Sequence, residues 1–304
     1  MKLYVGITDR DWFQFLRATN APEMNFWRPR NTTEFQAVSP GELFLFKLKF
    51  PENKIVGGAY FVRHTVLPLD LAWDVFGEAN GCDSFEVFRQ KIASLRRDNE
   101  RNPQIGCTVL TDPFYLSDLA LWSAPADWSR SIVTGKSYDA SNQIGQELFE
   151  RAKAAMHLKH STSDSILQEA PPRYGTEQLI KPRLGQGGFR VVVLEGYERK
   201  CAITGEKTLP VLDAAHIQPY ANDGPHDLSN GLLLRSDWHT LFDRHYITIA
   251  NDYRIEVSKK IKEEFSNGRE YYAYHGSQLK VLPEKLSERP GKSFLEWHQS
   301  RFLS

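Results

Sequence analysis

The stretch from residue 208 to residue 244 constrains the fold of this chain more than any other. Residues 208–217, TLPVLDAAHI, have the composition and alternation of a strand. Residues 232–235 indicate a short return strand, and residues 238–244 make about two turns of helix, with Ser236 or Asp237 as the expected N-cap. The pattern therefore predicts a β-hairpin followed directly by a short helix.

Polar side chains are placed at regular points along this hairpin and helix. His216 lies near the end of the first strand, Asp213 precedes it by three residues, and Asn230 comes just before the return strand. His239 and Asp243 are four residues apart, so they lie on one face of the helix. An imidazole and a carboxylate at that spacing could share one metal ion of mixed hardness, such as Mg²⁺ or Mn²⁺.

Four sequence blocks in this region resemble those of the HNH endonucleases of the ββα-metal superfamily. The blocks are CAITG at 201–205, AAHIQP at 214–219, NGLLL at 230–234 and HTLFD at 239–243. The resemblance implies that His216 is a general base that deprotonates water, that Asn230 tethers the loop and orients this base by hydrogen bonding, and that His239 binds the metal.

Two departures from that family concern metal sites. Many members have an acid immediately before the base, where this chain has Ala215, so Asp213 and Asp243 are both candidates for the second ligand. Many members also hold a structural zinc with Cys-x-x-Cys pairs, whereas Cys201 is followed by Thr204 at the second position. We therefore expect one divalent ion, Mg²⁺, Mn²⁺ or another transition metal, and no structural zinc.

A second resemblance covers residues 1–130. A turn at residues 40–41 opens a strand at 42–49, and residues 54–62 return as its partner, with glycines at 57–58 where another backbone or a ligand comes close. This hairpin resembles the small β-barrel of the PUA-like superfamily, which includes EVE, ASCH and SRA-type modules. The resemblance implies recognition of nucleic acid carrying a modified base, which some members flip into an aromatic pocket.

Residues 25–30, NFWRPR, are expected to form a loop because the proline restricts its neighbours. Phe26 and Trp27, followed by Arg28, suit base stacking and phosphate contact. The alternative is that these aromatic residues pack onto their own barrel. Trp73 is a further candidate for the wall of a DNA-binding pocket.

Two arginines flank the hairpin motif and are candidate phosphate contacts. These are Arg190 and Arg235, although a single arginine is more often a solvated charge. The remaining histidines are not expected to act in catalysis. His226 is expected at the surface, and His298 is expected to be structural.

Length and composition set the outer limits. A chain of 304 residues is long for one domain, and we expect an α+β protein with a PUA-like recognition domain at 1–140, a helical linker at 141–182 and the HNH domain at 183–304. Lys+Arg and Asp+Glu are equal at 38 each, so DNA contacts must come from local patches. Three scattered cysteines and the lack of any ~20-residue apolar run predict a cytoplasmic protein with no membrane span.

A recognition barrel joined to a nuclease resembles the modification-dependent restriction enzymes. The resemblance implies that the first domain detects a modified base, such as methylated or hydroxymethylated cytosine, in double-stranded DNA that the second domain cuts. Cutting both strands requires two sites, so a homodimer is expected. Two alternatives stay open: a nuclease on unmodified DNA or RNA, and a non-catalytic reader with a degenerate HNH domain, which only Ala215 favours.

Overall fold

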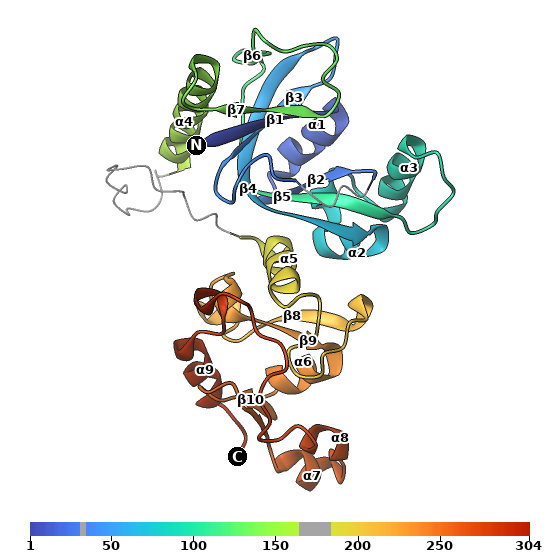
Figure 1. Ribbon diagram of the computed structural model, residues 1–304, viewed down its shortest axis with the longest axis vertical. Helices are drawn as coiled ribbons and strands as arrows, with labels where there is room; N and C mark the ends of the chain where they lie inside the picture. Colours follow the sequence, from blue (N-terminus) through green and yellow to red (C-terminus); the bar gives the residue numbers. More distant parts are fainter. Residues whose placement is uncertain (31–34, 164–183) are drawn as a thin grey trace. The chain divides into compact units, whose positions relative to one another are not determined.

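The computed structural model describes residues 1–30, 35–163 and 184–304 (Figure 1). These residues form two compact units, Met1–Gly188 and Phe189–Ser304, which are described one at a time. Both combine helices and strands, which confirms the predicted α+β class. The predicted domain bounds stay a prediction, and residues 164–182 of the predicted linker lie outside the described residues. Among the described residues, no helix is both long and apolar enough to cross a membrane.

The first unit is built on one seven-stranded sheet with the order β2-β5-β4-β3-β1-β7, to which β6 adds by pairing with β4. The strands are β1 (Lys2–Thr8), β2 (Glu23–Arg28), β3 (Leu43–Leu48), β4 (Lys54–Pro68), β5 (Gln104–Tyr115), β6 (Trp122–Ser123) and β7 (Gly135–Asp139). Strands β1 and β3 run parallel, and the other pairs are antiparallel. The β4–β5 register shifts twice, and such shifts bend a strand.

Strand β3 separates two apolar cores because its side chains point alternately to opposite faces of the sheet. Phe44 and Phe46 belong to one core, and Leu43 and Leu45 belong to the other. Both faces of the strand predicted at residues 42–49 are therefore apolar. The prediction for Gly57 is confirmed, since a Cβ there would lie 2.3 Å from the backbone oxygen of Phe114 in the adjacent strand.

Helices of the first unit cover this sheet, with α2 beside β4 and β5, and α4 beside β1 and β7 (Figure 1). They are α1 (Arg10–Thr19), α2 (Leu69–Phe76), the 3₁₀ turn η1 (Gly77–Asn80), α3 (Phe85–Leu95) and α4 (Gln143–Ser163). Asp9 caps α1, because its side chain accepts a hydrogen bond from the N–H of Trp12 at 2.8 Å. The cap directs Trp12, Phe13 and Leu16 into the core.

The second unit contains the predicted β-hairpin and helix. Strand β8 (Leu212–His216) pairs antiparallel with β9 (Gly231–Arg235), and α6 (Ser236–Asp243) begins at the residue after β9. The register places His216 opposite Gly231. The first strand is shorter than predicted, because Leu209–Val211 form a 3₁₀ turn with a proline in its first positions.

The predicted N-cap of the short helix is wrong. Arg235 occupies the cap position and makes no side-chain capping bond. Ser236 instead donates to the carbonyl of Val211 at 3.1 Å, and Asp237 pairs with Arg235. Packing therefore holds the helix, since Trp238 and Phe242 are buried on its inner face.

Further elements surround the hairpin. They are α5 (Gln186–Gly196), η2 (Leu209–Val211), η3 (Tyr220–Asn222), η4 (Leu228–Asn230), β10 (Ile247–Ile249), β11 (Ile255–Val257), α7 (Lys260–Phe265), α8 (Arg269–Tyr272), η5 (Leu286–Glu288) and α9 (Lys292–Gln299). Cys201 is buried, and its sulfur accepts the backbone N–H groups of Thr204 and Arg235, each at 3.4 Å. This sulfur ties the 201–205 turn to the start of α6.

Candidate active site

His216 is the candidate base, and it lies half-buried at the end of β8. Its ring stacks on Phe189, with centroids 3.8 Å apart and planes 13° apart. The pKa of His216 is lowered to about 4, mainly because the ring is buried and also because of the charges of His226 and His239. The imidazole is therefore neutral at pH 7 and can accept a proton.

His226 does not stand alone at the surface as expected. Its Nδ1 lies 2.9 Å from Nε2 of His216, and burial lowers its pKa. Its ring stacks on Tyr220, with centroids 4.7 Å apart and planes 8° apart. The sequence did not indicate this contact, because closure of the loop brings His226 to the hairpin and no periodic pattern marks it. The only available signal was its position in the same loop as Asn230.

Asn230 is fully buried and holds the loop between the two strands. Its Oδ1 accepts the N–H of Gln218, and its Nδ2 donates to the carbonyls of Gln218 and Pro225, each at 2.9 Å. The side-chain bonds found for Asn230 thus go to backbone groups. Any orientation of His216 by this residue acts through the backbone and not through a bond to the ring.

His239 brings together both candidates for the second metal ligand. Its Nδ1 is 3.4 Å from Oδ2 of Asp213 on β8, and its Nε2 is 3.3 Å from Oδ2 of Asp243 on its own helix. Burial raises the pKa of Asp243, and the negative charge of Asp213 raises it further, against the opposing effect of nearby histidines. The two carboxylates therefore face opposite nitrogens of one imidazole.

This donor set is chemically suited to a divalent ion. Imidazole nitrogen and carboxylate oxygen together suit Mn²⁺ and related metals. Within the described ranges, no group of three or more His, Cys, Asp or Glu side chains is arranged around one point. A metal-bound imidazole commonly donates its other N–H to a carboxylate. One aspartate could accordingly share an ion with His239 while the other orients the ring.

The two candidate arginines differ in their surroundings. Arg190 is half-buried on α5. Arg235 donates to Asp237 at 2.6 and 2.7 Å and to Glu270 at 2.8 Å, and these hydrogen bonds raise its pKa. A phosphate would have to compete with two carboxylates for Arg235. Contact of either arginine with DNA stays a prediction.

The predicted loop at residues 25–30 is wrong for residues 25–28, because Glu23–Arg28 form β2, which pairs with β5. Phe26 is buried, and its ring lies edge-on to Trp12 with centroids 5.5 Å apart. Trp27 is half-buried and donates through Nε1 to the carbonyl of Asn80 at 2.8 Å. The burial of Phe26 fits the alternative that it packs onto its own sheet, but both rings also line a cavity.

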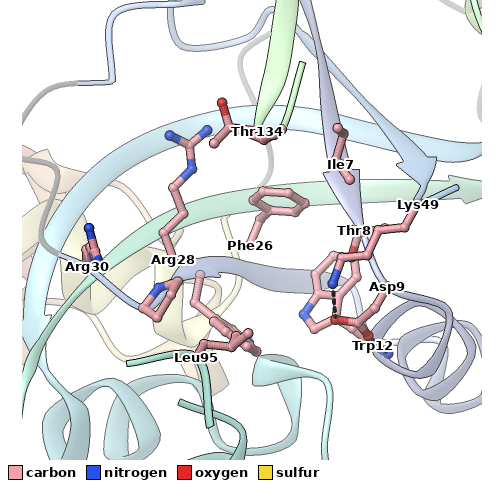
Figure 2. Close-up of a pocket in the computed structure, with 13 residues that line it drawn as sticks. Ile7, Thr8, Asp9, Trp12, Phe26, Arg28, Arg30, Lys49, Leu95 and Thr134 are labelled. Atoms are coloured by element: carbon pink, nitrogen blue, oxygen red, sulfur yellow. Dashed lines mark hydrogen bonds and ion pairs between the residues drawn. The ribbon is translucent and has the colours of Figure 1, made fainter. Parts of the chain in front are cut away.

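That cavity has a volume of about 340 Å³, near the lower end for small-molecule sites. Figure 2 shows the ring of Phe26 in the middle of the lining residues, with Arg28 on one side and Lys49 and Asp9 on the other. The lining residues are Ile7, Thr8, Asp9, Trp12, Phe26, Trp27, Arg28, Pro29, Arg30, Lys49, Leu95, Val133 and Thr134. The cavity thus combines aromatic walls with three cations and one carboxylate.

Some of the residues predicted to bind DNA line this cavity and one does not. Phe26, Trp27 and Arg28 line it together, whereas Trp73 is not among its lining residues. The Trp73 ring instead packs against Phe85 and Phe88, with centroids 6.2 and 6.1 Å away. Trp12 also lines the cavity although its ring is buried in the core of the unit, and its position on a helix gives no sign of a pocket.

The second unit thus has a β-hairpin that ends its first strand at His216, followed by a helix in which His239 lies between two carboxylates. Residues 201–250 match the family described as HNH endonuclease. The second unit therefore contains an HNH endonuclease domain, and the protein is a nuclease enzyme.

The chain also resembles solved structures at low sequence identity. The ASCH protein of Zymomonas mobilis is 13% identical, with a TM-score of 0.35 over 49% of this chain and 94% of that chain. A modification-dependent restriction endonuclease, TagI, is 11% identical, with a TM-score of 0.29 over 93% of this chain and 76% of that chain. No curated protein matches significantly. The family match at residues 201–250 confirms the resemblance to HNH endonucleases drawn from the sequence.

Proposed function

We propose that this nuclease is a metal-dependent endonuclease that cuts double-stranded DNA carrying modified bases, with modified cytosine as its target. The observation that supports the catalytic part is that His239 on α6 lies 3.4 Å from Asp213 of β8, the strand that ends at His216. A base and a candidate metal ligand thereby come from the strand and the helix of one small motif.

The residues of the chain divide the hydrolysis between them. His216 removes a proton from the attacking water, and general bases of this kind contribute about 10²- to 10⁴-fold to rate. Asn230 keeps the loop after His216 in place. When bound at His239 with Asp213 or Asp243, a divalent ion would supply charge neutralisation at the phosphate and the leaving oxygen.

Recognition of a modified base is proposed for the cavity in the first unit. Removing a base from a duplex costs a few kcal/mol, and stacking on aromatic rings returns ~1–3 kcal/mol per base. Trp12, Phe26 and Trp27 offer such rings, and Arg28 and Lys49 offer positive charge for the flanking phosphates. Phe26 and Trp27 keep their proposed role in DNA binding as walls of this cavity.

Two further parts of the proposal concern assembly and location. A homodimer would place two HNH domains on one duplex, which is the simplest way to cut both strands. The three cysteines Cys82, Cys107 and Cys201 are all free and buried, which suits the reducing cytoplasm.

Cleavage of one plasmid in three forms tests the proposal. The plasmid carries cytosine, 5-methylcytosine or 5-hydroxymethylcytosine and is incubated with Mg²⁺, Mn²⁺ or chelator. We expect metal-dependent cutting of a modified form and none by His216→Ala. Equal cutting of all three forms would reject modified-base recognition, and preferential cutting of RNA would favour the alternative substrate. Undiminished cutting by His216→Ala would reject the assignment of the base.

A further inference from the structure

The two imidazoles of His216 and His226 form a pair that the HNH assignment does not explain. Nε2 of His216 and Nδ1 of His226 are 2.9 Å apart, which is a hydrogen-bonding distance. A hydrogen bond between two neutral imidazoles needs one donor and one acceptor, so the pair has two possible tautomeric arrangements.

Only one of these arrangements leaves His216 able to act as a base while the pair stays intact. If His226 donates, Nε2 of His216 is occupied as an acceptor and its Nδ1 carries the proton, so no lone pair is left for water. If His216 donates through Nε2, its Nδ1 lone pair is free. The requirement for a base therefore selects His226 Nδ1 as the acceptor.

His226 is held in place from two directions. Its ring stacks on Tyr220 at 4.7 Å, and the preceding residue, Pro225, is bonded through its carbonyl to Asn230. The chain before it is also tightly closed, because a Cβ on Gly224 would lie 1.8 Å from the carbonyl oxygen of Gln218. The loop thus fixes the backbone at His226, and the Tyr220 ring packs against its imidazole.

The face of the His216 ring is fixed separately. Phe189 stacks on it at 3.8 Å, which limits tilting but leaves rotation within the ring plane unconstrained. A hydrogen bond at Nε2 supplies the missing in-plane constraint. Phe189 and His226 thus constrain the same imidazole in complementary ways.

We propose that His226 is a positioning residue that accepts the Nε2–H of His216 and so fixes the tautomer in which His216 Nδ1 takes the proton from water. The assignment rests on the proposed function, in which His216 is the base for DNA cleavage. In the step itself, an O–H bond of water breaks and an Nδ1–H bond forms. The hydroxide attacks phosphorus as the leaving oxygen departs with its electron pair and is protonated by solvent. The imidazolium then donates a charge-assisted hydrogen bond to His226, which is roughly twice as strong as a neutral one.

Three variants of the full-length protein test this role by kinetics. His226→Ala should lower kcat roughly 10- to 100-fold, as removal of an orienting partner does at other sites, with KM for DNA nearly unchanged. His226→Asn should restore most of the lost rate, because its Oδ1 can accept from Nε2 of His216. His275→Ala, at an exposed histidine of the same unit, is the control and should keep the wild-type kcat. Thermal unfolding of each variant shows that it is folded.

A second measurement does not depend on activity. Long-range ¹H–¹⁵N spectra of ¹⁵N-histidine-labelled protein report the tautomer of each ring, with His216 assigned by its loss in His216→Ala. We expect the Nε2–H form of His216 in wild type and in His226→Asn, and a mixture in His226→Ala. The Nδ1–H form in wild type, an unchanged kcat in His226→Ala, or no recovery in His226→Asn would each overturn the proposal. If the wild type cuts no nucleic acid, the proposed function is rejected. The spectra would still show which imidazole donates the hydrogen bond between His216 and His226.

Discussion

Asn230 binds both backbone groups of Gln218 through its side chain. Oδ1 of Asn230 accepts the N–H of Gln218, and Nδ2 of Asn230 donates to the Gln218 carbonyl, each at 2.9 Å. Gln218 comes two residues after His216, and the third bond of Asn230 goes to Pro225, the residue before His226. One buried amide therefore fixes the backbone beside both imidazoles. This geometry gives a structural reason for an asparagine at the centre of the motif.

Replacing this asparagine should destabilise the second unit. We expect Asn230→Ala to lower the free energy of unfolding by about 2–4 kcal/mol. Each lost hydrogen bond contributes ~0.5–1.5 kcal/mol, and the backbone groups left without a partner add a desolvation cost. Urea denaturation followed by tryptophan fluorescence measures the change. Asn251→Ala removes an exposed bond to Glu296 and serves as the control. Equal stability of the two variants would show that the loop does not need the amide.

The two aspartates around His239 should differ in their effect on metal binding. Asp213 shares β8 with His216, so an ion near the activated water is expected on the Asp213 side of the ring. Asp213→Asn should then abolish Mn²⁺ binding, as His239→Ala should. Asp243→Asn should weaken it only about 10- to 100-fold, as loss of an orienting partner does.

Electron paramagnetic resonance of free Mn²⁺ during titration measures these affinities. Asp252→Asn is the matched control, because Asp252 is an exposed carboxylate of the same unit that pairs with Arg254. The reverse order, with Asp243→Asn abolishing binding and Asp213→Asn only weakening it, would place the ion at the other nitrogen. Undiminished binding in both variants would reject the site.

Acidification should destabilise the fold through His298, which is buried. Its Nε2 lies 3.0 Å from the carbonyl of Phe242, which can only accept, so Nε2 carries the proton and Nδ1 accepts from Thr248 at 2.8 Å. Burial lowers the pKa of His298 to about 4 from an ordinary value of 6.5. The folded state therefore binds fewer protons than the unfolded state between these values, and stability is lost as the pH falls from 6.5 towards 4.

The unfolding midpoint in urea at pH 7.5, 6.0 and 5.0 measures this loss. His216, with a pKa of about 4, contributes in the same direction. His298→Gln should start from a lower stability but show a shallower decline with pH. A midpoint that rises on acidification in the wild type would contradict the buried neutral state of these rings.

Sequence reasoning succeeded where spacing alone fixes geometry. The hairpin and helix of the HNH motif were predictable because His239 and Asp243 are one turn apart and β8 and β9 are close in sequence. The strand at residues 23–28 was not predictable, because its partner β5 begins at Gln104 and supplies burial that the local sequence does not indicate. Local signals, a proline and two arginines, favoured a loop, and pairing across the sheet overrode them.

The residues of the two sites that the sequence did not indicate share one property: the fold brings them together from separate segments. His226 reaches His216 only through closure of the loop that Asn230 fixes. The cavity takes Trp12 from α1, Phe26 from β2, and Thr134 from the residue before β7. Segments that are far apart in sequence meet there because the sheet order interleaves them.

Arg28 provides a test of the cavity that leaves the HNH domain intact. Its Nη2 donates to the hydroxyl of Tyr4 at 2.9 Å, which fixes the guanidinium at the cavity wall. In a His216→Ala background that cannot cut, Arg28→Ala should weaken binding of a modified duplex. If Arg28 contacts a phosphate, the slope of log affinity against log salt should become shallower by about 1. Fluorescence anisotropy across a salt series measures both effects.

Two further variants separate charge from position at the cavity wall. Arg17→Ala removes a cation of the same unit that pairs with Asp118 and does not line the cavity, so affinity and salt slope should stay at the parent values. Tyr4→Phe keeps the Arg28 charge but removes its anchor, so affinity should fall less than in Arg28→Ala, with little change in slope. Binding of modified DNA by Arg28→Ala at the parent affinity and slope would remove this cavity from DNA recognition.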